Sequence, residues 1–178
     1  MTMTLPASTP APATRVPHEM ILRVAVALVG LIEAFTGLVD LVVIGDIAKT
    51  PDLSPGGLVT LAPMVLHLLL GLAAIGFAAT RHLRLGVAAL AVWALARWGH
   101  DISLLMRDGL GISSAYDMTS NGLALFRAFG QPLLSAAALA AAWRNRHLAI
   151  ATAAIAVMTL IDLGGIALFA IAVALYGA

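Results

Sequence analysis

Ionisable side chains recur inside the apolar stretches of this chain, where a bilayer would normally exclude them. In GLIEAFTGLVD, the residues Gly30, Glu33, Gly37 and Asp40 follow one another at steps of three, four and three. Residues at these spacings share one face of an α-helix. The segment therefore predicts a helix with a stripe of small and acidic residues, whose glycines allow a second helix to approach the acids closely.

The other apolar stretches carry similar polar faces. Arg97 and Asp101 in ALARWGHDISLL lie four residues apart, and Thr159, Asp162 and Gly165 lie at steps of three. The simplest geometry points all these faces at one another. The candidate residues for binding a ligand or a proton are Glu33, Asp40, His67, Arg97, His100, Asp101, Arg127 and Asp162.

Two interpretations of these groups stay open. An ionisable residue at the centre of a lone membrane helix costs about 2.5 to 3.5 kcal/mol, so each group needs a partner, water or neutralisation. Arg97 and Arg127 can pair with two of the four carboxylates, and we expect unpaired Glu33 and Asp162 to be protonated. The groups then either fix the register of the helices as internal fasteners or form a site for a ligand, proton or ion.

Composition defines the class of protein. Of the 178 residues, 61% are hydrophobic and 11% charged, with a mean hydropathy of +1.00, which indicates an integral membrane protein. A formal net charge of +1 leaves no electrostatic footprint for nucleic acid. The absence of cysteine excludes disulfides, thiolate metal sites and cysteine nucleophiles.

Five stretches are long enough to span a bilayer, which needs about 20 apolar residues. They predict an all-α, antiparallel bundle of five transmembrane helices, a single unit over residues 20–178. Four prolines in residues 1–19 predict a mobile or extended N-terminal tail instead. The predicted spans are 20–45, 57–79, 83–106, 121–143 and 148–176.

Basic residues predict the orientation of the bundle. Six arginines fall on one side of the predicted spans: Arg15, Arg23, Arg81, Arg84, Arg144 and Arg146. The positive-inside rule then puts the N-terminus in the cytoplasm and the C-terminus outside. Because Glu33, His67 and Asp162 fall near the middle of their spans and other polar groups fall outward of them, we expect a polar pocket that opens to the outer side.

Pro132 interrupts the fourth predicted span. Because proline has no N–H, it frees the carbonyl of Ala128 and is expected to bend the helix. Gln131 could satisfy that carbonyl. Trp98 and Trp143 lie near predicted helix ends, where interfacial anchoring is the ordinary role of tryptophan, whereas Trp93 lies deep enough to be a cation-π partner or a pocket wall.

No cofactor is predicted. A b-type haem needs two histidines at matching depth, whereas His67 and His100 differ by about 7 Å along the helix axes. A metal site from Glu33, His67 and Asp162 has workable ligand types but no recognised spacing. The chain contains no G-x-S-x-G, H-E-x-x-H or phosphate-binding glycine loop, so an enzyme is not favoured.

The opening ILRVAVALVGLIEAFTG, an arginine leading into a glycine-spaced helix, resembles the small DoxX-like bacterial membrane proteins over about the first hundred residues. That group is expected to have four spans, so no residue roles or activity are transferred to this chain. The leading functional hypothesis is a non-catalytic accessory or assembly subunit in a bacterial inner membrane, with a membrane-protein partner or a second copy of the chain. The alternatives are a binder or carrier of a small ligand, proton or cation, and a membrane-embedded redox or quinone-linked enzyme.

Overall fold

The computed structural model describes residues 18–47, 55–109 and 121–176, which are helical apart from short turns and contain no strand. This confirms the predicted all-α class. The helices are α1 (His18–Ile47), α2 (Pro55–Ala79), α3 (Leu83–Asp108), α5 (Gln131–Trp143) and α6 (Leu148–Tyr176). Residues 121–125 are helical and lead into η1 (Phe126–Gly130), one wide π-helical turn. Residues 18 and 19 of the predicted tail begin α1, and the rest of that tail lies outside the described residues.

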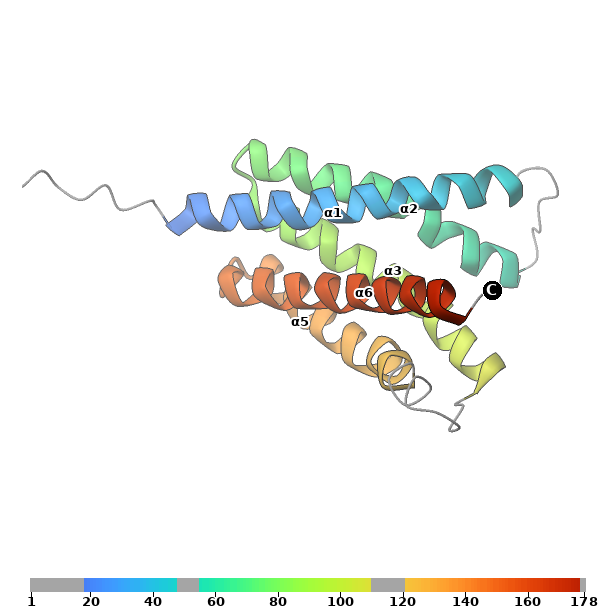
Figure 1. Ribbon diagram of the computed structural model, residues 1–178. Helices are drawn as coiled ribbons and strands as arrows, with labels where there is room; N and C mark the ends of the chain where they lie inside the picture. The colour runs from blue at the N-terminus through green and yellow to red at the C-terminus, as the bar shows by residue number, and fades with distance from the viewer. Residues whose placement is uncertain (1–17, 48–54, 110–120, 177–178) are drawn as a thin grey trace, which may run out of the picture.

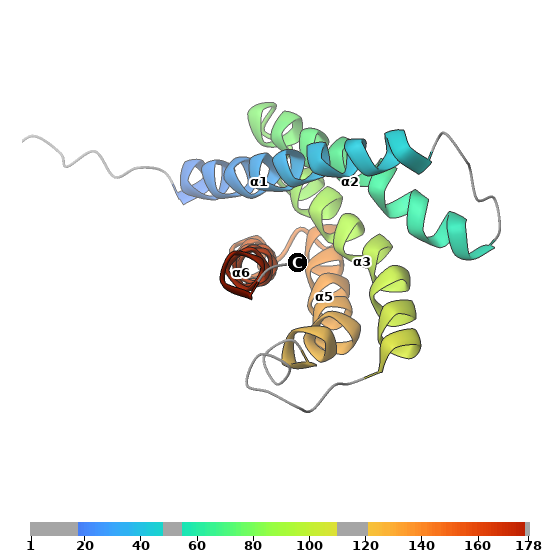
Figure 2. The same ribbon diagram turned by 45° about the vertical axis from the view of Figure 1, so that its right-hand side comes forward.

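Consecutive helices run in opposite directions. The α1–α2 hairpin lies on one side of the bundle and the pair α5–α6 on the other, with α3 crossing obliquely between them (Figure 1). The turned view shows α6 almost end-on below α1, with α3 reaching from α2 to α5 (Figure 2). Contacts between α1 and α6, and between α3 and every other helix, close the bundle.

Glycines set the separation of α1 and α2. A Cβ atom added at Gly71 would lie 2.7 Å from the backbone nitrogen of Ala34, and one at Gly37 would lie 2.7 Å from the nitrogen of Leu68. Both distances are too short for any side chain, so the two backbones are in direct contact. The predicted close approach of a second helix to the glycine stripe is confirmed, and the second helix is α2.

The two short turns end their helices in the same way. Arg81 and Asn145 adopt positive φ angles of 66° and 50°. The next residue then donates its N–H to a carbonyl five residues earlier, from His82 to Phe77 (2.8 Å) and from Arg146 to Ala141 (3.0 Å). This bond is the outer one of the Schellman motif, which reverses the chain at a helix end.

Arg23 joins the start of α1 to the end of α2. Its Nε donates to the carbonyl of Ala78 (2.7 Å) and its second guanidinium nitrogen to that of Ala79 (2.9 Å). These carbonyls have no partner within their own helix, and a cation there also complements the helix dipole. The arginine therefore fixes the register of the hairpin at this end.

The apolar core gathers at the end of the bundle that holds the short turns. Val26, Val87, Leu90 and Ala74 are almost completely buried there. Alanines make up half of the core cluster, and they allow the helices to pack closely. The polar groups described below lie farther along the helices, toward the end with the long connections.

Four described segments are long and apolar enough to cross a membrane: His18–Asp40, Leu61–Ala79, Asn121–Trp143 and Leu148–Leu175. Large apolar side chains such as Leu31, Phe35, Leu72 and Leu160 are exposed on the outside of the bundle. Both observations indicate a multi-pass membrane protein. The helix α3, which carries Arg97 and Asp101, is not among the four.

Gly71→Ala tests the contact between α1 and α2. We expect the free energy of unfolding to fall by about 1 to 3 kcal/mol, because the new Cβ meets backbone atoms that can move only with the whole helix. Reversible unfolding in mixed detergent micelles measures the change. Gly76→Ala is the matched control on α2: its Cβ would meet nothing within 4 Å, so stability should stay equal or rise by up to about 1 kcal/mol. Equal effects of the two substitutions would contradict the close contact.

Candidate functional site

His67 of α2 lies between two carboxylates of α1. Its Nε2 is 3.0 Å from Oε2 of Glu33, and its Nδ1 is 2.6 Å from Oδ2 of Asp40. The oxygen of Thr36 also lies 3.1 Å from Nε2, while the hydroxyl of Thr36 donates to carbonyls of its own helix. We name Glu33, His67 and Asp40 the carboxylate–imidazole network. It exists because the glycine contact brings α2 close to α1.

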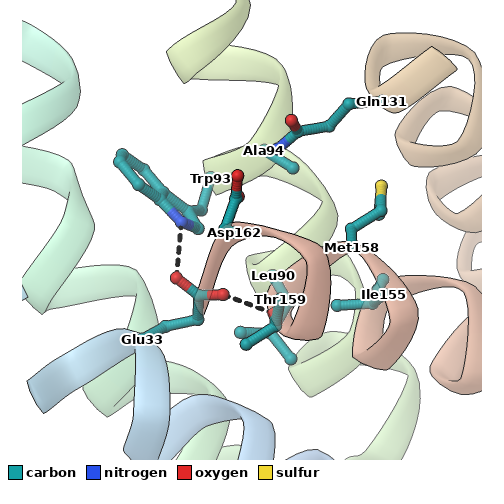
Figure 3. A pocket seen from close by; sticks show the side chains of 9 residues that line it. All are labelled: Glu33, Leu90, Trp93, Ala94, Gln131, Ile155, Met158, Thr159 and Asp162. Atoms are coloured by element: carbon teal, nitrogen blue, oxygen red, sulfur yellow. Dashed lines mark hydrogen bonds between the residues drawn. The ribbon is translucent and has the colours of Figure 1, made fainter. Parts of the chain in front are cut away.

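Glu33 is the most heavily bonded group of this network. Trp93 of α3 donates its indole N–H to Oε2 (3.0 Å), and the hydroxyl of Thr159 of α6 donates to Oε1 (Figure 3). One carboxylate thus holds side chains from three other helices. Three donors on a buried carboxylate stabilise its ionised form.

Trp93 also forms a wall for the imidazole. Its ring and that of His67 are stacked, with centroids 3.8 Å apart and an interplanar angle of 11°. The predicted role as a pocket wall is confirmed, and the ring that Trp93 contacts is the imidazole of His67. The stack holds the imidazole plane in the orientation that reaches both carboxylates.

A second network joins α3, η1 and α6. Asp162 accepts from Arg97 (3.0 Å) through Oδ2 and from Arg127 (2.7 Å) through Oδ1, and Nε of Arg97 lies 3.4 Å from Asp101. We name these four residues the arginine–aspartate network. The expectation that Asp162 lacks a partner is wrong, because two guanidinium groups share it. The same expectation for Glu33 is also wrong, because three side chains bond to its carboxylate.

The interruption at Pro132 takes the form of a π-helical turn. The N–H of Gln131 donates to the carbonyl of Phe126, five residues earlier. The freed carbonyl of Ala128 accepts instead from the indole N–H of Trp98 on α3, at 2.7 Å. The predicted release of Ala128 is confirmed, but the prediction that Gln131 satisfies it is wrong, and Trp98 links two helices as well as facing outward.

A cavity of about 480 Å³ lies against both networks, lined from α1, α2, α3 and α6. Its polar wall includes Glu33, Asp40, His67, Arg97 and Asp162. The larger part of its lining is apolar, with Ile32, Val39, Met64 and Leu163 among the residues. Six of the eight predicted site residues line it, namely Glu33, Asp40, His67, Arg97, His100 and Asp162. The other two, Asp101 and Arg127, do not line it but form ion pairs with Arg97 and Asp162, which do.

A much smaller cavity of about 10 Å³ lies between Glu33, Asp162 and Gln131, as Figure 3 shows. This is about the room that one water molecule needs. Gln131 is only 4% exposed, and its Oε1 makes no hydrogen bond within the part of the chain that the structure describes. The cavity therefore contains a buried acceptor beside both charged networks.

The described residues offer no group of three histidine, aspartate or glutamate side chains arranged to hold a metal ion. Both ring nitrogens of His67 instead face carboxylate oxygens. The arrangement can accept hydrogen-bond donors and positive charge from a molecule in the cavity.

The fold and this site define a helical membrane protein with a polar pocket inside the bundle. No family model, curated protein or solved structure matches the chain. The resemblance to DoxX-like proteins thus has no support from a family match.

Thr159→Val tests the link between α6 and Glu33. The substitution keeps the shape but removes a donor to a buried carboxylate, so we expect the free energy of unfolding to fall by about 1.5 to 3 kcal/mol. Thr152→Val is the control on the same helix. Thr152 is equally buried but donates only to the carbonyl of Leu148 in its own helix. Unfolding in detergent compares the two, and a loss at Thr152 as large as that at Thr159 would show that the bond to Glu33 contributes nothing.

Proposed function

We propose that this chain is a five-span protein of the bacterial inner membrane that binds a small lipid-soluble molecule with a polar head. The large cavity beside the two charged networks is the observation that carries the proposal. The polar wall suits the head of the ligand, and the apolar walls suit its body. This corresponds to the ligand-binding alternative predicted from the sequence.

Cavity size favours a ligand over a purely structural role. Ligand pockets usually measure roughly 300 to 1,000 Å³, and the 480 Å³ cavity lies within that range. Protein interiors otherwise contain few voids larger than a water molecule. If the ion pairs served only to hold the helices together, we would expect no such space beside them, because polar interactions are stronger where packing excludes water.

The rim of the cavity favours entry from the bilayer. Phe35 (68% exposed), Val39 (60%) and Ile166 (53%) line the cavity and also face the outside of the bundle. They belong to α1 and α6, so the opening lies between these two helices. A lipid-soluble molecule could enter there without crossing a polar surface.

Charge pairing supports α3 as a fifth span. Its 26 residues extend about 39 Å, more than the roughly 30 Å of a hydrocarbon core. Its Arg97 pairs with Asp101 on the same helix and with Asp162 on α6, and paired charges that face the bundle interior are tolerated in membranes. The proposed topology keeps the arginine-rich short turns in the cytoplasm. Bacterial origin rests on alanine-rich, lysine-poor usage.

The predicted accessory or assembly subunit and the predicted redox or quinone-linked enzyme stay predictions. Exposed apolar faces suit lipid, a partner helix and a second copy of the chain equally well. The cavity favours the ligand-binding role over that of an accessory subunit without a ligand.

Single-cysteine variants test the topology, because the natural chain has no cysteine. With the short turns inside, Thr80→Cys and Asn145→Cys should react with a membrane-impermeant maleimide only after the cells are permeabilised. Ser54→Cys and Ser113→Cys, in the long connections, should react in intact cells. Denatured samples control for the reactivity of each thiol. Labelling of Asn145→Cys in intact cells would overturn the proposed orientation, and labelling of Thr80→Cys and Asn145→Cys from opposite sides would remove the fifth span.

Filling the cavity tests the binding site. Three pyrene probes with a cationic, a neutral and an anionic head are partitioned between protein-containing and empty phosphatidylcholine nanodiscs. At least one should be retained by the protein. Leu163→Trp places an indole in the cavity and should weaken that retention by about tenfold or more, because the probe loses its space. Leu160→Trp is the control, one turn away on α6 and 62% exposed outside the cavity. Retention no higher than in empty nanodiscs, or equal losses in both variants, would refute the proposed binding.

A further inference from the structure

The two networks beside the large cavity do not balance in charge. Each ring nitrogen of His67 faces a carboxylate oxygen at hydrogen-bonding distance, and each such bond needs one proton. Two carboxylates and an imidazole that share two protons carry a net charge of minus one, wherever the protons sit. With only these two protons, the carboxylate–imidazole network is negative.

The arginine–aspartate network contributes nothing to offset this charge. Its two guanidinium groups are matched by the carboxylates of Asp101 and Asp162. His100, which also lines the cavity, adds no charge in its neutral form. Among the described residues, one uncompensated negative charge then remains beside a cavity whose lining is mostly apolar, where an unpaired charge is strongly unfavourable.

Asp40 exposes this negative charge to the cavity. Its Oδ2 contacts His67, and no other hydrogen bond or ion pair engages its carboxylate within the part of the chain that the structure describes. Its side chain keeps 27% of its surface exposed. Glu33 is less available, because His67, Trp93 and Thr159 already occupy its oxygens.

The smaller cavity adds a second acceptor that lacks a partner. Oε1 of Gln131 is buried and makes no hydrogen bond to the described residues, and it lines a space shared with Glu33 and Asp162. Trp93 and Thr159 line both cavities. One water molecule in that space would satisfy this oxygen.

We propose that the large cavity takes a lipophilic monovalent cation, with its positive head at Asp40 and its apolar body against Ile32, Met64 and Leu163. This rests on the proposed function, since it names the class of ligand for the same cavity. The cation supplies the one charge that the site lacks. Anions are disfavoured, and neutral molecules bind without this gain.

The charge count covers the charged and titratable groups that face the site among the described residues. They are Glu33 and Asp40 on α1, His67 on α2, Arg97, His100 and Asp101 on α3, Arg127 on η1 and Asp162 on α6.

The three pyrene probes test this inference in the full-length protein. They are the trimethylammonium derivative of pyrenylmethane, pyrenylmethanol and pyrenesulfonate, so that no head group itself titrates near neutral pH. Phosphatidylcholine nanodiscs give the lipid no net charge. We expect the protein to bind the cation about tenfold or more tightly than the alcohol, and to bind the sulfonate most weakly.

Asp40→Asn assigns the effect to one residue. The variant should lose the preference for the cation and bind the cation and the alcohol equally, because the negative carboxylate is gone. Glu19→Gln, the same change of charge at the exposed start of α1, is the control and should keep the preference for the cation.

The possible outcomes separate the inference from the proposed function. Tighter binding of the alcohol or the sulfonate by the natural chain would overturn the cation while leaving a ligand site. A preference that survives Asp40→Asn would overturn the assignment to Asp40. Absence of all three probes from the protein would remove both proposals. The comparison of probes needs only the natural chain, so it stands even if Asp40→Asn fails to fold.

Discussion

The backbone contact between α1 and α2 is the constraint on which the rest of the bundle depends. At Gly37 and Gly71 neither helix has a side chain to keep the other away. Only at this separation can one imidazole reach Glu33 and Asp40, which lie two turns apart on α1. Trp93 then packs on that imidazole and bonds to Glu33, and Thr159 bonds to the same carboxylate. A contact between two backbones thereby sets the positions of α3 and α6.

The bundle is divided along its length into two unlike halves. The half with the short turns is held by small apolar side chains, by the Schellman turns and by Arg23 on the end of α2. The other half is held by hydrogen bonds and ion pairs between polar side chains, and it borders the cavity. Glu33 and Thr159 both join helices and line the cavity, so packing and the proposed binding share these residues.

Much of this arrangement follows from spacing in the sequence. Steps of three and four placed Glu33, Asp40 and the glycines on one face, and length and hydropathy gave helices whose bounds lie within two residues of those observed. The partner of each polar group could not be predicted, because helical spacing says nothing about how one helix is rotated relative to another. The pairing of Asp162 with two arginines and the position of His67 between two acids are therefore seen only in the structure. The turns at Arg81 and Asn145 lack the glycine that usually marks a left-handed residue, and the partner of Ala128 is a tryptophan one helix away.

The π-helical turn at Phe126–Gly130 amounts to one residue inserted into an otherwise regular helix. An insertion of one residue turns everything before it by about 100° relative to everything after it. Arg127, inside the turn, meets Asp162, while Ser135 and Ala138, beyond it, face the core. Residues 121–143 thus present one face before the π-helical turn and a different face after it. A regular α-helix could not turn both faces toward the same neighbouring helices. A related chain that lacks one residue here would keep the same hydropathy and almost the same length. It would nevertheless have lost the guanidinium of Arg127 from the site.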